Sequence, residues 1–209
     1  MSRRMFTFTT VLVLAIGGLA RAQQHTYGIK GGLNLAWIPA FNSVNALYPD
    51  DPVSSSSLAG ASVGVFFTLP LAGAVELEPE AMITRKGARM VDGYSDPARL
   101  SITYLELPLL VRVAPGASGR HRPYGFAGPF FGLRMSASLE AYGDSGDFTE
   151  NTRGTEFGVA FGGGVDAGRW LVEGRFTQGF TSFATDEATA SGEPSAPNRV
   201  FSVLAGVRF

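Results

Sequence analysis

The sequence lacks cysteine altogether and is poor in charged residues, which make up 17% of its 209 residues. Without cysteine there is neither a disulfide framework nor a thiolate site. Only two histidines, His25 and His121, could act as the general base that hydrolases usually need. The chain must therefore be stabilised by packing and backbone hydrogen bonds, and it offers little for catalysis.

Long hydrophobic runs are also missing beyond the N-terminal segment, so no transmembrane helix is expected. The N-terminal segment itself is typical of a secretory signal peptide. Arg3 and Arg4 precede the apolar stretch 5–19, and Ala20-Arg21-Ala22 offers a cleavage site. We therefore predict a signal peptide at residues 1–22 and one domain at residues 23–209. The formal net charge is −1 and the signal peptide would remove only basic residues, so nucleic acid is not expected as a partner.

What recurs after residue 22 is alternation of apolar and polar residues with period two, the pattern of a β-strand with one apolar face. Eight segments show this alternation. In the last one, every second residue from Phe209 back to Phe201 is apolar. In segment 75–84 the opposite face instead carries three glutamates. The sequence therefore predicts an all-β protein.

The connections between these segments alternate strictly between short and long. Short links are expected at residues 70–73, 115–122 and 166–168, and longer polar links at residues 38–57, 87–99, 139–152 and 181–197. Short periplasmic turns and long extracellular loops are the plan of an outer-membrane barrel, and strands of about 10 to 13 residues can span a bilayer at a tilt. We predict an eight-stranded antiparallel transmembrane up-and-down β-barrel in a bacterial outer membrane.

A soluble ligand-binding barrel would have similar strands, with its apolar side chains inside. Three features favour the membrane barrel. The polar faces are rich in Gly and Ala, as a narrow lumen requires, and closing the last strand onto the first removes an open edge. In addition, aromatic residues lie near both strand ends, as in two interfacial girdles: Tyr27, Trp170 and Phe209 toward the short turns, and Trp37 and Phe180 toward the long loops.

The interior of an eight-stranded barrel is just wide enough to be filled by side chains. The charged residues on the polar faces are therefore predicted to form an ion-pair network in the lumen, because buried charges need partners. A narrow proton or ion path is the alternative function for the same residues. The pattern does not determine which way segment 124–138 faces. The predicted network is Lys30, Glu76, Glu78, Glu80, Glu106, Arg112, Arg134, Glu156, Glu173, Arg175 and Arg208.

No catalytic residue, cofactor or metal site is predicted, and we expect the protein not to be an enzyme. His25 closely follows the predicted cleavage point, and His121 lies in a short turn. Neither stands beside a plausible nucleophile at the outer rim. The acidic loops 139–152 and 181–197 leave one alternative open, a divalent cation or a basic partner held at the cell surface.

Four segments, Tyr27–Asn34, Tyr104–Leu110, Arg122–Tyr124 and Val207–Phe209, resemble the PorT-like outer-membrane β-barrel family in their order and spacing. The resemblance covers nearly the whole mature chain. It implies an eight-stranded barrel in a Bacteroidetes-type outer membrane. It also implies that Val207 and Phe209 form the C-terminal signal read by the barrel assembly machinery.

Taken together, the sequence predicts a structural or binding barrel that is surrounded by outer-membrane lipid and contacts an envelope protein or other partner through its four long loops. The alternative is an accessory component of a protein secretion or envelope machine, the role of the best-known PorT-like protein.

Overall fold

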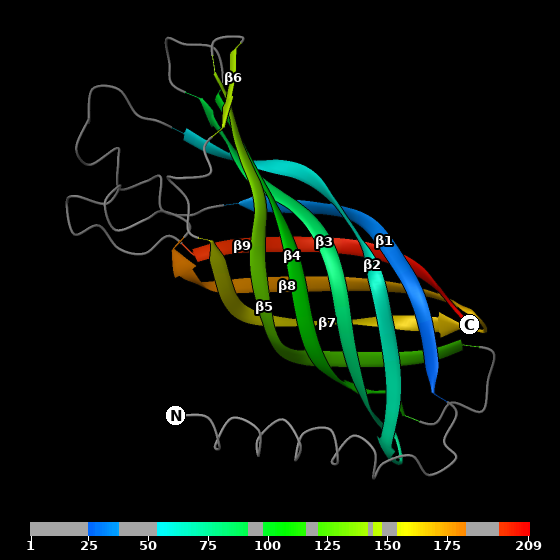
Figure 1. Ribbon diagram of the computed structural model, residues 1–209. Coiled ribbons are helices and arrows are strands. Elements are labelled where there is room, and N and C mark those ends of the chain that lie inside the picture. Colours follow the sequence, from blue (N-terminus) through cyan, green and yellow to red (C-terminus); the bar gives the residue numbers. More distant parts are fainter. Residues whose placement is uncertain are drawn as a thin grey trace, which may run out of the picture.

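The computed structural model describes residues 25–37, 54–91, 98–115, 121–141, 144–147, 154–182 and 197–209. The predicted signal peptide, residues 1–22, lies outside them. No helix in the described ranges is long and apolar enough to cross a membrane. The strands are β1 (Thr26–Trp37), β2 (Ser54–Ala72), β3 (Val75–Val91), β4 (Ala98–Val113), β5 (His121–Ala141), β6 (Asp144–Asp147), β7 (Thr155–Ala167), β8 (Trp170–Ser182) and β9 (Pro197–Arg208) (Figure 1).

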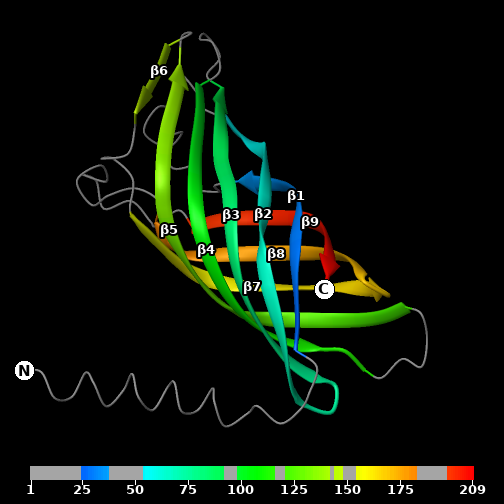
Figure 2. The same cartoon turned by 45° about the vertical axis from the view of Figure 1, so that its right-hand side comes forward.

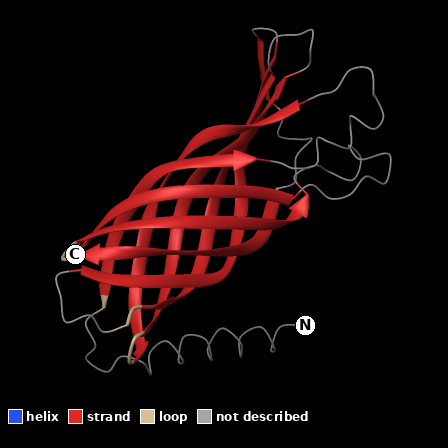
Figure 3. Ribbon diagram, turned by 180° about the vertical axis from the view of Figure 1, so that it is seen from behind, coloured by secondary structure: helices blue, strands red, loops and turns tan. Residues whose placement is uncertain are grey.

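Eight of these strands form a closed antiparallel barrel, which confirms the predicted fold. Neighbours in the chain pair in order from β1 to β5 and from β7 to β9, and β5 pairs with β7. Pairing of β1 with β9 closes the ring, in register from Gly28 opposite Arg208 to Trp37 opposite Arg199. Seen from behind, the strands wrap around the barrel at a tilt (Figure 3). The C-terminal strand therefore has a partner on both sides, and no edge of the barrel is left open.

The two ends of the barrel differ. At the turn end, which carries residues 73–74, residues 168–169 and Phe209, tight turns join β2 to β3 and β7 to β8. Gly73 and Gly168 adopt positive φ angles of 56° and 65°, which only glycine accepts readily. The opposite end, where the longer links lie, is called the loop end. The short link predicted at residues 115–122 ends earlier than expected, because His121 already belongs to β5.

The outer and inner faces of the wall have opposite chemistry. The outer face carries large apolar side chains such as Leu33, Val63 and Phe67, which are 73%, 59% and 52% exposed. The inner face carries buried charged residues together with Gly, Ser and Thr. A soluble barrel would need the reverse arrangement, whereas a continuous apolar belt of this kind suits lipid chains. The soluble alternative is therefore wrong.

The predicted strand lengths were too short for β2, β3, β4 and β5, which have 19, 17, 16 and 21 residues. Parts of the predicted loops 38–57, 87–99 and 139–152 belong to these strands and to β6. The reason is that strand pairing continues past the closed barrel: Ser54–Ser57 pairs with Ala88–Val91, and the end of β5 pairs with β4 and β6. We call this part, which consists of Ser54–Ser57, the loop-end parts of β3, β4 and β5, and strand β6, the sheet extension. Its β3, β4, β5 and β6 parts project away from β7 and β8 (Figures 1 and 2).

A charge placed on the outer wall should be costly in proportion to its depth. Val203, which is 52% exposed on β9, lies within the apolar belt. Val203→Arg is expected to destabilise the barrel by about 2–4 kcal/mol in lipid vesicles, because the guanidinium would displace lipid contacts far from water. Ser136→Arg is the matched control, since Ser136 is exposed near the loop end, and it should cost at most about 1 kcal/mol. Equilibrium unfolding in denaturant measures both losses; equal losses would contradict a lipid-facing wall.

Candidate functional site: the barrel interior and its ends

The predicted network residues all lie on the inner side of the wall. All are buried except Arg134 and Arg208, which are partly exposed. They belong to seven different strands, and their side chains point into the lumen because strand parity turns every second residue inward. The structure groups most of them into three clusters along the barrel axis, together with three charged residues that the sequence prediction did not include.

The lower cluster, nearest the turn end, joins Glu76 and Asp166 to three arginines. Arg112 forms ion pairs with both carboxylates, and Arg122 forms an ion pair with Glu76 and lies 3.4 Å from Asp166. Arg208 Nη1 donates to Asp166 at 2.9 Å. Arg112 is completely buried, whereas the Arg122 side chain is 35% exposed. Arg122 therefore caps the cluster on its water-facing side.

The middle cluster is built around Lys30. Its ammonium lies 3.1 Å from Glu78, 2.7 Å from Glu80 and 3.3 Å from Glu173. Arg175 binds the same Glu80 and Glu173 carboxylates at 2.7 and 2.6 Å. Glu78 connects this cluster to the lower one, since Arg208 and Arg112 lie 3.8 and 3.9 Å from it. The two clusters thus form one continuous ionic network on the turn-end side of the lumen.

The upper cluster consists of Lys86, Glu106 and Glu156. Lys86 forms ion pairs with both carboxylates, and Thr84 donates its hydroxyl to Glu106 at 2.7 Å. A small cavity with room for about one water molecule separates this cluster from Arg175 of the middle cluster. Its polar lining includes the hydroxyls of Ser62, Thr84, Thr177 and Ser202. Side chains thus occupy this part of the lumen on both sides of a water-sized gap between two charged layers.

Four aromatic rings fill the space between the charges, and each lies against a glycine on the neighbouring strand. A Cβ atom on that glycine would come within 2.8 Å of the ring or its hydroxyl. Each ring also lies near a cation, at 3.7 to 5.2 Å from the ring centroid. Such contacts favour the cation when it is removed from water. The sets are Gly28, Phe66 and Lys30; Gly164, Tyr124 and Arg112; Gly162, Phe126 and Arg175; and Gly158, Phe130 and Lys86.

Sequence reasoning missed three charged members of the interior, each for a different reason. Lys86 continues the inward parity of Glu76 to Thr84, but the polar face was followed only to Thr84. Arg122 was assigned to a short turn, although its parity matches that of Tyr124. Asp166 has the parity of Glu156 and was recognised as polar-face, but it was left out of the predicted network. Extending the period-two count to the strand ends would have found Lys86 and Arg122.

The structure resolves the facing of segment 124–138. Tyr124, Phe126 and Phe130 are buried in the lumen, and Arg134 shares their parity. The alternation then breaks, because an extra residue of β5 stands between the pairs Tyr104–Arg134 and Thr103–Ser136. This β-bulge explains why no single parity fits the whole segment.

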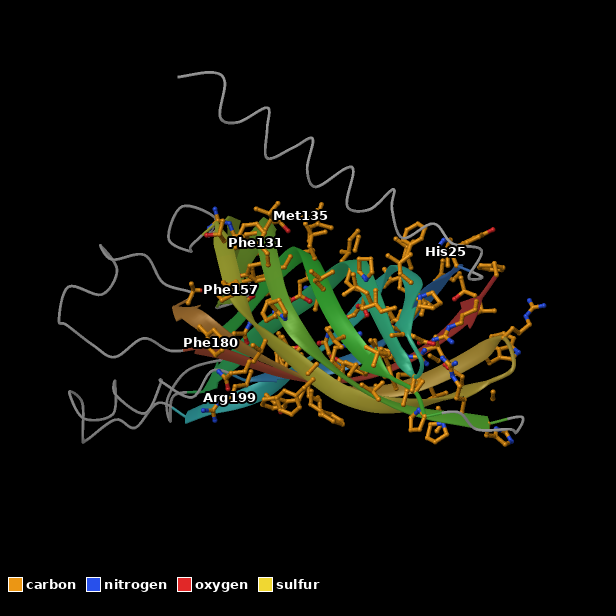
Figure 4. All side chains as sticks on the ribbon, turned by 90° about the horizontal axis from the view of Figure 1, so that it is seen from below. His25, Phe131, Met135, Phe157, Phe180 and Arg199 are labelled. Carbon is orange, nitrogen blue, oxygen red and sulfur yellow. The ribbon has the colours of Figure 1, made fainter. Side chains whose placement is uncertain are left out.

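Both histidines are exposed at the turn end. His25 stands directly before β1 (Figure 4), and His121 is the first residue of β5. The described residues include no group of three His, Cys, Asp or Glu side chains placed to hold a metal ion. The acidic loops 139–152 and 181–197 fall almost entirely outside the residues whose side chains are described.

The aromatic girdles are present where their side chains are described. At the turn end, Tyr27 packs against Phe67 and Phe209, with ring centroids 6.4 and 5.8 Å apart, and Trp170 is exposed. Toward the loop end, Phe157 contacts Phe180 at 6.1 Å (Figure 4). The side chain of Trp37 is outside the description. The predicted assembly residues Val207 and Phe209 lie on the outer side, and the amide of Phe209 donates to the Tyr27 carbonyl at 2.8 Å.

The glycine and ring pairs predict a sharp difference between two neighbouring glycines. A Cβ at Gly162 would meet the Gly174 carbonyl at 2.1 Å and Phe126 at 2.8 Å, whereas a Cβ at Gly174 would meet nothing within 4 Å. Gly162→Ala is expected to destabilise the barrel by about 1–3 kcal/mol, because the ring and backbone must shift. Gly174→Ala should stay within about 0.5 kcal/mol of the wild type. Denaturant midpoints of the folded proteins test this, and equal midpoints for the two variants would contradict it.

The lower cluster predicts a large cost for removing its buried arginine. Arg112→Met leaves Glu76 and Asp166 without their buried partner and should cost about 3–5 kcal/mol at neutral pH. Arg122→Met is the control, since Arg122 contacts the same carboxylates from a more exposed position and should cost less. Unfolding curves in denaturant at neutral pH would contradict the prediction if the two variants behaved alike.

Comparison with known proteins identifies solved structures with a similar fold and, below, a matching family. Two solved outer-membrane structures superpose on 90% of the chain. OprG from Pseudomonas aeruginosa has 15% sequence identity, a TM-score of 0.51 and 97% of its own chain covered. Neisserial surface protein A has 12% identity, a TM-score of 0.50 and all of its chain covered. At such low identity these likenesses support the fold alone. A search of curated protein sequences found no match.

The sequence itself matches the family model described as outer membrane protein beta-barrel domain over residues 21–185, which is most of the chain. The match agrees with the closed eight-stranded wall, the apolar outer belt and the alternation of short turns with longer links. In this architecture the turn end faces the periplasm and the loop end faces the cell exterior. The chain belongs to the outer membrane protein beta-barrel domain family and is a protein of the bacterial outer membrane.

Proposed function

We propose that this protein is a closed outer-membrane barrel that binds a partner at its extracellular end, and that it is neither a pore nor an enzyme. The proposal rests on a contrast between two parts of the β-structure, the closed barrel and the sheet extension. The closed barrel is filled by paired charges and rings, whereas β2 to β6 continue beyond it as the sheet extension. A filled lumen favours a function at the surface over one in the interior.

The sheet extension supports binding through its backbone. Among the described residues, β6 pairs only with β5, and Ser54–Ser57 pairs only with β3. Each therefore has one strand edge whose amide and carbonyl groups have no partner strand among the described residues. An extended segment of another protein could add to such an edge, with backbone hydrogen bonds giving affinity and side chains giving specificity. The partner that fits is therefore a protein with an extended segment exposed outside the cell.

The contents of the lumen favour a structural role over transport or catalysis. In the lower and middle clusters every arginine and Lys30 is paired with carboxylates, so these charges neutralise one another instead of lining an open path. Both histidines are exposed at the periplasmic end. The proposal therefore assigns the interior charges a structural role. Outer-membrane lipid surrounds the belt, and the assembly machinery would read the strand ending at Phe209.

An accessory role in a secretion or envelope machine is the second reading, suggested by the PorT-like resemblance. It differs from the main proposal in where contacts would form. A machine on the inner side of the membrane would contact the periplasmic turns, whereas a surface partner would contact β6 and the first residues of β2.

Site-specific photocrosslinking in whole cells distinguishes the two readings. A photoreactive residue at Ser145 in β6 is expected to give discrete protein adducts, and Ser145→Pro, at the same edge, should abolish binding of the captured partner once it is purified. The matched control probe is at Ala74, in the turn between β2 and β3. Adducts from Ala74 and none from Ser145 would overturn the surface-binding proposal in favour of an envelope machine.

Conductance across a planar bilayer tests the closed lumen separately. The purified protein is expected to give no steady current above the bare membrane at neutral pH. A reproducible ion-selective or proton-selective current would show that the lumen is a path, and the proposal of a purely surface function would then fail. Heat-modifiable gel mobility of the same sample verifies that the barrel is folded during the measurement.

A further inference from the structure

The outer wall changes chemistry abruptly near its extracellular end. On β3 the outward residues are apolar or proline up to Ile83, and the next outward residue is Arg85. On β9 the outward residues are apolar from Val207 to Phe201, and the next is Arg199. Two strands of the same wall thus end their apolar stretch with an outward guanidinium, and Arg199 lies toward the loop end with Phe157 and Phe180 (Figure 4).

These two arginines differ from the basic residues of the interior in their partners. Arg85 Nη2 donates to the hydroxyl of Ser101 at 3.2 Å, and Arg199 Nε donates to the side-chain carbonyl of Gln178 at 3.0 Å. Both partners are neutral. Within the described part of the chain, no carboxylate forms a salt bridge with either guanidinium, whereas Lys30, Lys86 and Arg112 each bind at least two. The outer rim therefore carries positive charge that the described protein groups do not neutralise.

The position of the rim specifies what can neutralise it. Arg85 and Arg199 are the next outward residues after Ile83 and Phe201, so the two guanidinium groups mark where the apolar belt ends on their strands. Thr103, opposite Arg85, adds a hydroxyl to the same outer wall. A guanidinium presents paired N–H donors that match phosphate oxygens. A free anion would gain nothing from the apolar belt below, whereas a lipid can place its phosphate at the rim and its chains against the belt.

We propose that Arg85 and Arg199 form a binding surface for the phosphate groups of the phosphorylated glycolipid in the outer leaflet of the outer membrane. Ser101 and Gln178 hold the two guanidinium groups against the wall, and Ile83 and Phe201 contact the lipid chains below them. This surface is distinct from the strand edges of the sheet extension. It anchors the barrel at a defined height and contributes no step to partner binding.

Native mass spectrometry of the folded protein in mixed micelles tests this directly. Wild-type protein is titrated with diphosphorylated lipid A and, in parallel, with the chemically dephosphorylated lipid. The wild type is expected to prefer the phosphorylated form. Arg85→Gln and Arg199→Gln should each weaken that binding by about fivefold, and the double variant by about twentyfold, because each interfacial arginine contributes separately to anion attraction.

Arg169→Gln is the matched control. Arg169 is also exposed and lies 5.9 Å from the Trp170 ring, but it stands at the periplasmic end. Its substitution should leave lipid A binding unchanged, and an equal loss would reveal general charge attraction and overturn the site. Equal binding of the phosphorylated and dephosphorylated lipids by the wild type would overturn it without any variant. If inorganic phosphate at millimolar concentration displaced the lipid fully, the site would be one for free phosphate, and the lipid assignment would fail.

Discussion

Most charged side chains inside this barrel are removed from water, and this constraint governs the rest of the structure. An unpaired buried charge is far more costly than a paired one. Lys30 on β1 is neutralised by Glu80 on β3 and by Glu173 on β8, and Arg175 on β8 reaches Glu80 across the lumen. The partners stand on strands that are not neighbours in the sheet. Closing the barrel and neutralising its charges are therefore one event, because neither Lys30 nor Arg175 has its full set of partners in an open sheet.

The same narrow interior decides where the aromatic rings lie and where function can be found. Phe126 fits only because Gly162 opposite it has no side chain, and the same ring lies near the Arg175 guanidinium. Ring, glycine and cation thus depend on one another, and the cavity between the upper and middle clusters has space for about one water molecule. The proposed interactions with other molecules therefore lie on the outer wall and on the sheet extension.

The sequence was sufficient to predict the fold class and the inward-facing residues of most strands, since alternation is a property of the extended backbone itself. It was insufficient at the strand ends, where the alternation continues beyond the membrane-spanning part of the wall. Lys86 was overlooked, and the strand residues 88–91 were assigned to a loop. The bulge after Arg134 hid the facing of segment 124–138, because an extra residue reverses the parity. The pairing of Lys30 with Glu80 and Glu173 depends on register and barrel closure, which one chain's pattern does not contain.

Two adjacent residues on β3 show how the strand register, the interior charges and the outer rim are connected. Lys86 points inward and binds Glu106 and Glu156, whereas Arg85 points outward and contacts only the Ser101 hydroxyl. A slip of one residue in the register of β3 would exchange the two side chains. It would bury the Arg85 guanidinium in place of the Lys86 ammonium and turn Glu76, Glu78 and Glu80 toward lipid. Since each of those changes is strongly unfavourable, the charges specify the register of β3. The same register keeps the interior neutral and places the positive charge on the outer rim.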